Sequence, residues 1–407
     1  MTSNGPLSGI RVLDLTIAMA GPLCSQRLGE MGAEVVKIEA PGGGDFSRHS
    51  PMAGVSRFGD ATCFVTLNRN KRSLVLDLKS EAGKDVLYRL VESADVFVQN
   101  FRPRVAAKLG IDYATLNAIN DKLVYASISG YGDEGPMRDR PGQDLLVQSY
   151  SGLTFNGGQA SGLPHPSPLY MVDTSASHMA CEGILAALVA RSRTGKGQEV
   201  KTSLLSAIME MQIQEVTSYL AADAPPRRGA SPQVSIWMEP PYGVYSCETG
   251  NLAIAQADLE VLSDVLELPQ LARLKVERPP QKDADAVTAW RDRICALVAG
   301  ILATKPAEYW DELLHEHGVW CGVVQDYATF LENGQADPYL VSMEHAVGGT
   351  YKTVAPGIRF SDDPQPEMRG APIYGADSTA ILSESGFGEA EIGTLLQSGA
   401  VVENSDQ

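Results

Sequence analysis

Residues 10–39, IRVLDLTIAMAGPLCSQRLGEMGAEVVKIE, decide the fold of this chain. The apolar run Ile10–Leu15 predicts a buried strand, Pro22–Met31 predicts a helix closed by Gly32, and Glu34–Glu39 predicts a second strand. Two strands joined by one such helix run parallel, because a right-handed crossover brings the chain back beside the first strand. The stretch therefore predicts the first strand-helix-strand unit of a parallel sheet.

The same rhythm continues along the first half of the chain. Further strands are expected at Ser73–Leu78, Asp95–Gln99 and Leu123–Ser129, with a helix over Glu81–Ala94. Strands and helices that alternate in this way form an open, doubly wound sheet. We therefore expect an α/β fold in which residues 1–220 form a large Rossmann-like domain with a parallel sheet.

A smaller α+β domain is expected over residues 226–325. It follows a polar, proline-rich link that begins at Pro225, and the hairpin-like runs Tyr242–Cys247 and Leu252–Gln256 come before several helical stretches. Residues 330–407 are rich in Gly and Pro. We expect them to return to the large domain, although their pattern alone assigns them to neither.

The charge balance excludes several classes of partner. The 407 residues include 33 Lys or Arg and 50 Asp or Glu, so the net charge of −17 disfavours nucleic acid and anionic membranes. No apolar run approaches the ~20 residues that span a bilayer, and no signal-peptide pattern opens the chain. The six cysteines are scattered without a CxxC pair. We expect a cytoplasmic protein with reduced thiols.

No glycine fingerprint for a dinucleotide or a nucleoside triphosphate is present. The loop after the first strand lacks GxGxxG, and neither GKS nor GKT occurs. Residues 69–108 instead carry nine basic side chains against five acidic ones. A cationic segment beyond the ends of parallel strands can hold a polyphosphorylated small molecule. The alternative is that these cations pair within the fold, above all Lys84 and Arg89 along helix faces.

Asp173 has a pattern that admits two interpretations. It precedes a long apolar helix expected over Ser175–Arg191, which makes it an N-cap whose side-chain oxygen accepts a backbone N–H. The same position suits a carboxylate nucleophile, because the partly positive helix end could stabilise an oxyanion on the attacked carbonyl. The pattern does not separate the two. The histidines offer no HExxH or other ligand spacing, so we expect no metal site.

Several segments, taken in order, resemble the family III CoA transferases. This family includes formyl-CoA:oxalate CoA transferase, carnitine CoA transferase and the 2-methylacyl-CoA racemases. The matching segments are LSGIRVLDLT at 7–16, AGP at 20–22, LGEMGAEVVKIE at 28–39, GD at 44–45 with Arg48, NKRS at 70–73, DV at 95–96 and NF at 100–101 with Pro103, followed by a weaker match at 241–245, PYGVY.

The resemblance implies a nucleophile, a CoA site and an oligomeric state. Transferases of this family are interlocked homodimers whose large domain holds CoA. Their nucleophile is an aspartate at the head of a helix that ends in Ala-Ala-Leu, here Ala186–Leu188, and the matching residue is Asp173. The CoA-binding positions that carry over are Met19, Ala20, Leu76, Asp77, Leu78, Lys79, Asn100, Phe101, Arg102, Lys108, Gln143 and Asp144. No cofactor is expected beyond the cosubstrate coenzyme A or acyl-CoA.

The acceptor acid is less well defined by the resemblance. Ala40 stands where the oxalate enzyme has an arginine, and Ser231–Trp237 takes the place of its glycine-rich loop, so the likeness does not extend to oxalate specificity. Arg48, Arg227 and Arg228 are candidates to bind a second carboxylate or a sulfinate. We therefore expect a small dicarboxylate or a sulfinate analogue as acceptor.

The expected reaction moves CoA from an acyl-CoA donor such as succinyl-CoA to that acid, through a mixed anhydride and an aspartyl-CoA thioester on Asp173. A 2-methylacyl-CoA racemase is an alternative. Its family motif is Gly-His-Asp, whereas here Gln143 precedes Asp144, and an amide cannot abstract a proton from the α-carbon. An acyl-CoA-binding protein without catalysis is another alternative, although binding alone does not require Asp173.

Overall fold

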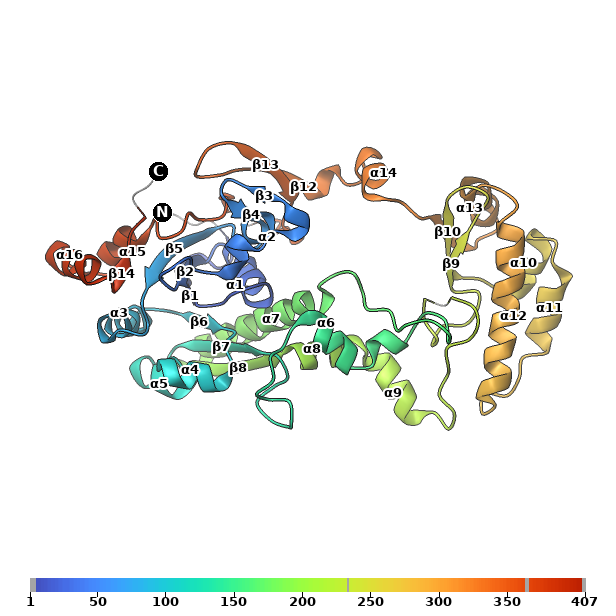
Figure 1. Ribbon diagram of the computed structural model, residues 1–407, viewed down its shortest axis with the longest axis horizontal. Coiled ribbons are helices and arrows are strands. Elements are labelled where there is room, and N and C mark those ends of the chain that lie inside the picture. The colour runs from blue at the N-terminus through green and yellow to red at the C-terminus, as the bar shows by residue number, and fades with distance from the viewer. Residues whose placement is uncertain (1–4, 233, 363–365, 405–407) are drawn as a thin grey trace. The chain divides into compact units, whose positions relative to one another are not determined.

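The computed structural model describes residues 5–232, 234–362 and 366–404 (Figure 1). Its chain divides into two compact units. The first comprises the described residues of 1–147, 170–208 and 337–407, and the second comprises those of 148–169 and 209–336. The C-terminal segment thus groups with the large sheet, whereas 148–169 and 209–220, which were expected in the large domain, group with the second unit.

A seven-stranded sheet forms the first unit, in the order β14-β5-β2-β1-β6-β7-β8. Its strands are β1 (Arg11–Asp14), β2 (Glu34–Glu39), β5 (Lys71–Leu76), β6 (Val96–Gln99), β7 (Val124–Ser129), β8 (Gln198–Ser203) and β14 (Val401–Val402). Neighbouring strands are parallel except β14, which runs antiparallel to β5. The expected α/β fold with a parallel sheet is confirmed.

The strand order reverses at β1, which has β2 on one side and β6 on the other. Val12 lies opposite Val35 of β2 and Val96 of β6. At such a switch point the connections leave toward opposite faces of the sheet, and the space beyond the carboxyl ends of the strands binds ligands. The loop from β1 to α1 (Ala20–Glu30) and the loop from β6 to α4 (Pro103–Leu109) flank this point.

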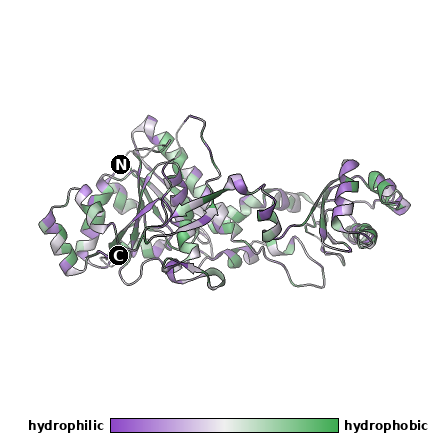
Figure 2. Ribbon diagram, turned by 90° about the horizontal axis from the view of Figure 1, so that it is seen from above, coloured by the Kyte–Doolittle hydropathy of each residue, from purple (hydrophilic) through white to green (hydrophobic). Residues whose placement is uncertain are grey.

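Helices cover both faces of the sheet. On one face α1 packs against α7 (Met171–Thr194), and these two helices contact β1, β2, β6, β7 and β8. On the other face, buried Leu13, Val36, Leu74 and Phe97 form a core with side chains of other helices. These are α3 (Glu81–Glu92), α4, α5 (Tyr113–Ile119), α15 (Ser378–Glu384) and α16 (Glu389–Ser398). Hydrophilic and hydrophobic residues alternate along the helices, as expected when one side of each is buried (Figure 2).

Shorter elements also belong to the first unit. Two antiparallel hairpins pair β3 (Ser56–Arg57) with β4 (Asp60–Ala61), and β12 (Leu340–Glu344) with β13 (Thr350–Val354). The helix α2 (Thr62–Leu67) follows the first hairpin.

The second unit holds a three-stranded antiparallel sheet in the order β11-β10-β9. The expected hairpin forms between β9 (Gly243–Ser246) and β10 (Asn251–Gln256), and β11 (Trp320–Val323) is added beside it. The helices of this unit are α9 (Ile213–Ala221), α10 (Leu259–Val265), α11 (Pro269–Val276), α12 (Ala284–Leu302), α13 (Ala307–Glu316) and α14 (Tyr327–Glu332). Two further helices, α6 (Asp144–Tyr150) and α8 (Leu204–Met211), cross the unit boundaries.

Within 5–232, 234–362 and 366–404, no helix combines the length and the apolar character needed to cross a membrane.

Candidate active site

The loops after β1 and β6 are fastened together by one amide side chain. Asn100 accepts the backbone N–H of Ile17 at Oδ1 (3.0 Å) and donates from Nδ2 to the Ile17 carbonyl oxygen (2.7 Å). Met19 ends the first loop and Ala20 begins α1, while Phe101 and Arg102 follow Asn100 in the second loop. Asn100 therefore holds these two groups of expected CoA-binding residues at the same edge of the sheet.

The loop after β1 rests on buried ion pairs. Lys71 Nζ lies 2.9 Å from Asp14 Oδ2, and Lys37 Nζ lies 3.0 Å from Asp45 Oδ2. Lys37 also donates to the Thr16 carbonyl oxygen (2.9 Å), while Asp45 accepts the N–H of Ala18 (3.2 Å). Ala18 has a φ of 68°, an uncommon backbone conformation for a side chain with a Cβ. The ion pairs thus hold a strained loop in place.

The pKa values of Asp14 and Lys71 reflect this burial. Burial by itself would raise the pKa of Asp14, but Lys71, Lys37 and two hydroxyl groups outweigh it and lower that pKa to about 2. Burial lowers the pKa of Lys71 to about 8, against the opposing effect of Asp14. Both side chains are fully enclosed, so they act on the loop and not on a ligand.

The other expected CoA positions lie beyond β5 and around α4. Leu76 ends β5 and is buried, and Asp77 folds back to accept the N–H of Lys79 (3.0 Å) before α3 begins. Lys79 is exposed, as are Arg102 at the start of α4 and Lys108 in its last turn. Because β5, β1 and β6 are parallel, these residues share one edge of the sheet, with β2 between β5 and β1. The three cations are available at this edge.

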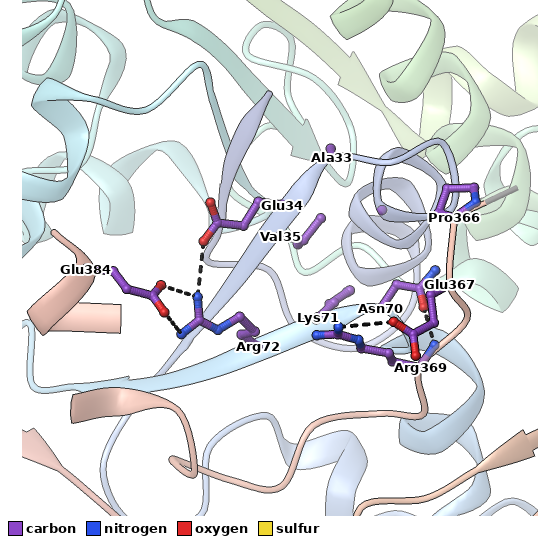
Figure 3. Close-up of a pocket in the computed structure, with 11 residues that line it drawn as sticks. Ala33, Glu34, Val35, Asn70, Lys71, Arg72, Pro366, Glu367, Arg369 and Glu384 are labelled. Atoms are coloured by element: carbon purple, nitrogen blue, oxygen red, sulfur yellow. Dashed lines mark hydrogen bonds and ion pairs between the residues drawn. The ribbon is translucent and has the colours of Figure 1, made fainter. Parts of the chain in front are cut away.

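Most other cations of the basic segment are paired within the fold. Arg69 pairs with Glu30, and Arg72 pairs with Glu34, Asp377 and Glu384. Figure 3 shows Arg72 between Glu34 and Glu384 in a pocket that Arg369 and Glu367 also line. Lys84 pairs with Glu81 along its own helix, as the alternative interpretation predicted. Arg89 is also paired, but with Glu391 of α16 and not along its own helix face.

Arg48, a candidate for binding the acceptor acid, is enclosed in the first unit. Its Nε and Nη2 donate to the two oxygens of Glu39 (2.9 and 2.8 Å), and its Nη1 donates to Asp60 (2.9 Å). The guanidinium also lies 3.7 Å from the centre of the Phe64 ring. Because its donors are directed at these partners, Arg48 stabilises the segment after β2. It has no pair of N–H groups directed at a ligand.

Asp173 lies inside the first turn of α7 and is not its N-cap. The helix begins at Met171, four residues before the expected start, and the N-cap residue Tyr170 makes no side-chain capping bond. The cap comes from Asp144, whose Oδ2 accepts the backbone N–H groups of Val172 (2.8 Å) and Asp173 (3.0 Å). The N-cap interpretation of Asp173 was therefore wrong, because a residue distant in sequence occupies that end of the helix.

The position of Asp144 depends on two glycines. Gly142 precedes α6, and Gly130 follows β7, and a Cβ on either residue would collide with the backbone of the other. The Gly130 carbonyl oxygen also accepts the N–H of Leu205 (3.0 Å). The close approach delivers Asp144, only 1% exposed, to the start of α7, whereas the neighbouring Gln143 is exposed.

The carboxyl group of Asp173 is unusually basic. Burial, and secondly the negative charge of Asp144, raise its pKa from the ordinary 3.8 to about 7. A carboxyl group with such a pKa is ionised to a useful extent at neutral pH and is a stronger nucleophile than an ordinary carboxylate. Perturbed groups of this kind are concentrated at functional sites.

A separate cavity of about 560 Å³ lies in the second unit. Arg227 and Arg228 both line it, with Phe155 stacked 4.7 Å from the guanidinium of Arg228. Trp237 donates from its indole N–H to Asn156 (3.1 Å) at the same cavity. That Phe155 and Asn156 line the same cavity as the two arginines could not be found from the sequence, because no local pattern links 155–156 to 227–228.

Comparison with known proteins gives a consistent result. The family model described as CoA-transferase family III matches residues 7–378. Succinyl-CoA:glutarate CoA-transferase of Mus musculus is 29% identical over 98% of this chain and 91% of its own length. Acetyl-CoA:oxalate CoA-transferase of Acetobacter aceti is 31% identical over 95% of this chain and 98% of its own length. The crystal structure of a CAIB/BAIF family protein from Brucella suis superposes with a TM-score of 0.77 at 28% identity, and the match covers 94% of this chain and all of that one.

Proposed function

Because the chain belongs to CoA-transferase family III, we propose that it moves CoA from an acyl-CoA donor such as succinyl-CoA to a small carboxylic acid, with Asp173 as the nucleophile. The observation that carries this proposal is the site of Asp173. Its carboxyl group has a pKa raised to about 7, and it stands in a helix turn whose N–H groups are bonded to another carboxylate. A basic, partly enclosed carboxylate is what attack on a thioester requires.

The proposed reaction needs only carboxylates and a thiolate. The Asp173 carboxylate attacks the thioester carbonyl, the C–S bond breaks, and a mixed anhydride and the CoA thiolate result. The thiolate then attacks the Asp173 carbonyl of the anhydride, which releases the donor acid as a carboxylate and leaves an aspartyl-CoA thioester. The acceptor carboxylate repeats the two steps in reverse. No proton or electron is gained or lost overall, so no cofactor beyond CoA is proposed.

We propose that CoA binds along the sheet edge described above. The loops joined by Asn100 and the exposed Lys79, Arg102 and Lys108 support this placement. Lysine and arginine side chains suit the phosphates of CoA. Asp144 and Gln143 fit less directly, because the Asp144 carboxylate is buried against α7 and Gln143 alone is exposed.

A short dicarboxylate, or a sulfinate analogue of one, is the acceptor we propose. The relatives named for glutarate and oxalate both act on dicarboxylates by their names, which supports the class without selecting a member. A second carboxylate is best bound by arginine. Arg227 and Arg228, which line one cavity, are the candidates, because the ion pair of Arg227 with Asp285 (2.9 Å) lies at the surface and can open. Arg48 is not carried forward, because Glu39 and Asp60 hold its guanidinium inside the first unit.

We further propose an interlocked homodimer in the cytoplasm. Apolar side chains on α9 support a second copy, because Ile213, Tyr219 and Leu220 are 62%, 59% and 79% exposed. Six free cysteines fit a reducing compartment. Light scattering on the purified chain tests the dimer, and a monomer at micromolar concentration would refute it.

Covalent trapping tests the function. The protein is incubated with succinyl-CoA and hydroxylamine, which converts an acylated carboxylate to a hydroxamate, and the peptides are analysed by mass spectrometry. We expect a hydroxamate at Asp173 in the wild type and none in Asp173→Asn. Asp112→Asn is the matched control, because Asp112 also lies at a helix start, where it accepts the N–H of Thr115 (3.2 Å), and it should leave trapping intact. An unmodified Asp173 with succinyl-CoA still bound would refute the transferase proposal.

A further inference from the structure

We propose that Asp144 is the positioning residue of the nucleophile: its carboxylate occupies the N–H groups that begin α7, so that the side chain of Asp173 is held off the helix end and remains available to attack. This inference rests on the proposed function, in which the free carboxylate of Asp173 attacks the thioester.

The geometry of the first helical turn carries the inference. The N–H groups that open a helix lack partners within it, and a nearby carboxylate normally takes them. Asp173 lies in that turn and would be a suitable acceptor. Instead Asp144 Oδ2 accepts both Val172 (2.8 Å) and Asp173 (3.0 Å). Among the residues that the structure describes, no hydrogen bond is accepted by the side chain of Asp173.

The neighbouring charges leave Asp144 as the group that acts on Asp173. On α1, which packs against α7, Arg27 lies 3.5 Å from His178, more than a turn beyond Asp173. On β8, which also packs against α7, Lys201 is paired with Glu199 (3.2 Å) and with Asp133 (2.9 Å). After burial, only Asp144 contributes to the raised pKa of Asp173. The same carboxylate therefore keeps the helix N–H groups away from Asp173 and makes it more basic.

A charged cap is also the favourable choice for the helix. A negative side chain at a helix N-terminus interacts well with the helix dipole. If Asp173 filled this role itself, the dipole and the hydrogen bonds would stabilise its ionised form and lower its pKa, which would weaken it as a nucleophile. Assigning the cap to a second carboxylate separates the two roles.

The ionisation of Asp173 can be measured without any substrate. Carbodiimide coupling with glycine ethyl ester labels a carboxyl group in its protonated form, and the Asp173 peptide is quantified by mass spectrometry between pH 4 and 9. In the wild type we expect labelling to fall with a midpoint near 7. Asp144→Asn retains an oxygen that can accept an N–H but removes the charge, and it should lower the midpoint by about one pH unit or more.

Two further variants separate positioning from general structure. Asp144→Ala removes both charge and acceptor, so it should lower the midpoint and also slow hydroxamate formation at pH 8, about tenfold relative to Asp144→Asn. Asp112→Asn should leave both unchanged. Thermal unfolding of each variant shows whether it is folded at the assay temperature.

The outcomes distinguish this inference from the proposed function. An unchanged midpoint in Asp144→Asn overturns the inference, and so does a wild-type midpoint near 4, which needs no variant to fold. The labelling result stands even if succinyl-CoA produces no hydroxamate at Asp173. In that case the transferase proposal fails while the effect of Asp144 on Asp173 is still decided.

Discussion

Replacing Asp173 with asparagine should stabilise the protein at pH 8 while abolishing its proposed chemistry. Burial, with a smaller contribution from Asp144, raises the pKa of Asp173 from 3.8 to about 7. Below pH 4 the carboxyl group is protonated in the folded and the unfolded chain alike. Between pH 4 and 7 only the unfolded chain loses the proton, so the wild type loses stability as the pH rises, and the loss is complete above 7. Asparagine removes this penalty.

The size of the effect follows from that interval. About 3 pH units at ~1.4 kcal/mol each give an upper bound of about 4 kcal/mol. Because the Asp173 side chain is partly open to solvent, the gain at pH 8 is expected to be about 2 kcal/mol. At pH 4.5 it should be a small fraction of that value.

Urea unfolding of the wild type and of Asp173→Asn at pH 4.5 and pH 8 measures the difference. Asp112→Asn again serves as the control, because asparagine caps a helix about as well as aspartate, and it should give no gain at pH 8. An equal gain for Asp173→Asn at both pH values, or none at pH 8, would refute the reasoning from the buried carboxyl group.

Three other predictions concern the site and its scaffold. The rate of Asp173 acylation in a single turnover with succinyl-CoA should fall about tenfold per pH unit below pH 7 and level off above it, because only the ionised carboxylate attacks. A rate independent of pH from 5 to 8 would contradict this. Lys71→Met leaves Asp14 buried without its partner at 2.9 Å, so it should lower the free energy of unfolding in urea by about 3–5 kcal/mol. Lys84→Met removes a surface ion pair and should leave the urea midpoint unchanged. Asn100→Ala removes both bonds to Ile17, which should raise the KM for the acyl-CoA about tenfold with little change in the unfolding midpoint; an unchanged KM would separate this loop from CoA binding.

Most strands of the parallel sheet could be predicted, because each has a recognisable pattern within its own few residues. Residues 10–15 are a mostly apolar run of strand length, and residues 34–39 are rich in β-branched side chains. The first became β1 with a shift of one residue at each end, and the second became β2 with the expected bounds. The start of α7 was placed four residues too late, because its cap is supplied by Asp144, which lies 28 and 29 positions before the two N–H groups it accepts. A cap from a distant residue leaves no mark in the sequence around the helix.

The roles of charged residues were harder to predict than the strands. The pattern around Asp173 left an N-cap and a nucleophile both open, and only the resemblance favoured the nucleophile. Arg48 was considered a ligand-binding residue, yet it is paired with Glu39 and Asp60. The composition gives the number of charged residues but not which of them form ion pairs. Ion pairs between residues distant in sequence are determined by the tertiary fold. Only the structure distinguishes a cation that holds the scaffold from one that can hold a ligand.

The distribution of these pairs explains why Asp173 can be basic at all. Lys37 and Lys71 under the loop after β1, and Arg48 in the segment after β2, each have acidic partners within about 3 Å, so their positive charges are neutralised where they lie. Had one of them reached Asp173, it would have lowered the pKa of that carboxyl group, as Lys71 and Lys37 do for Asp14. Asp173 instead has a carboxylate as its charged neighbour. The same kind of side chain is thus made strongly acidic in the scaffold and weakly acidic at the start of α7, and the difference arises from which charge the fold places beside it.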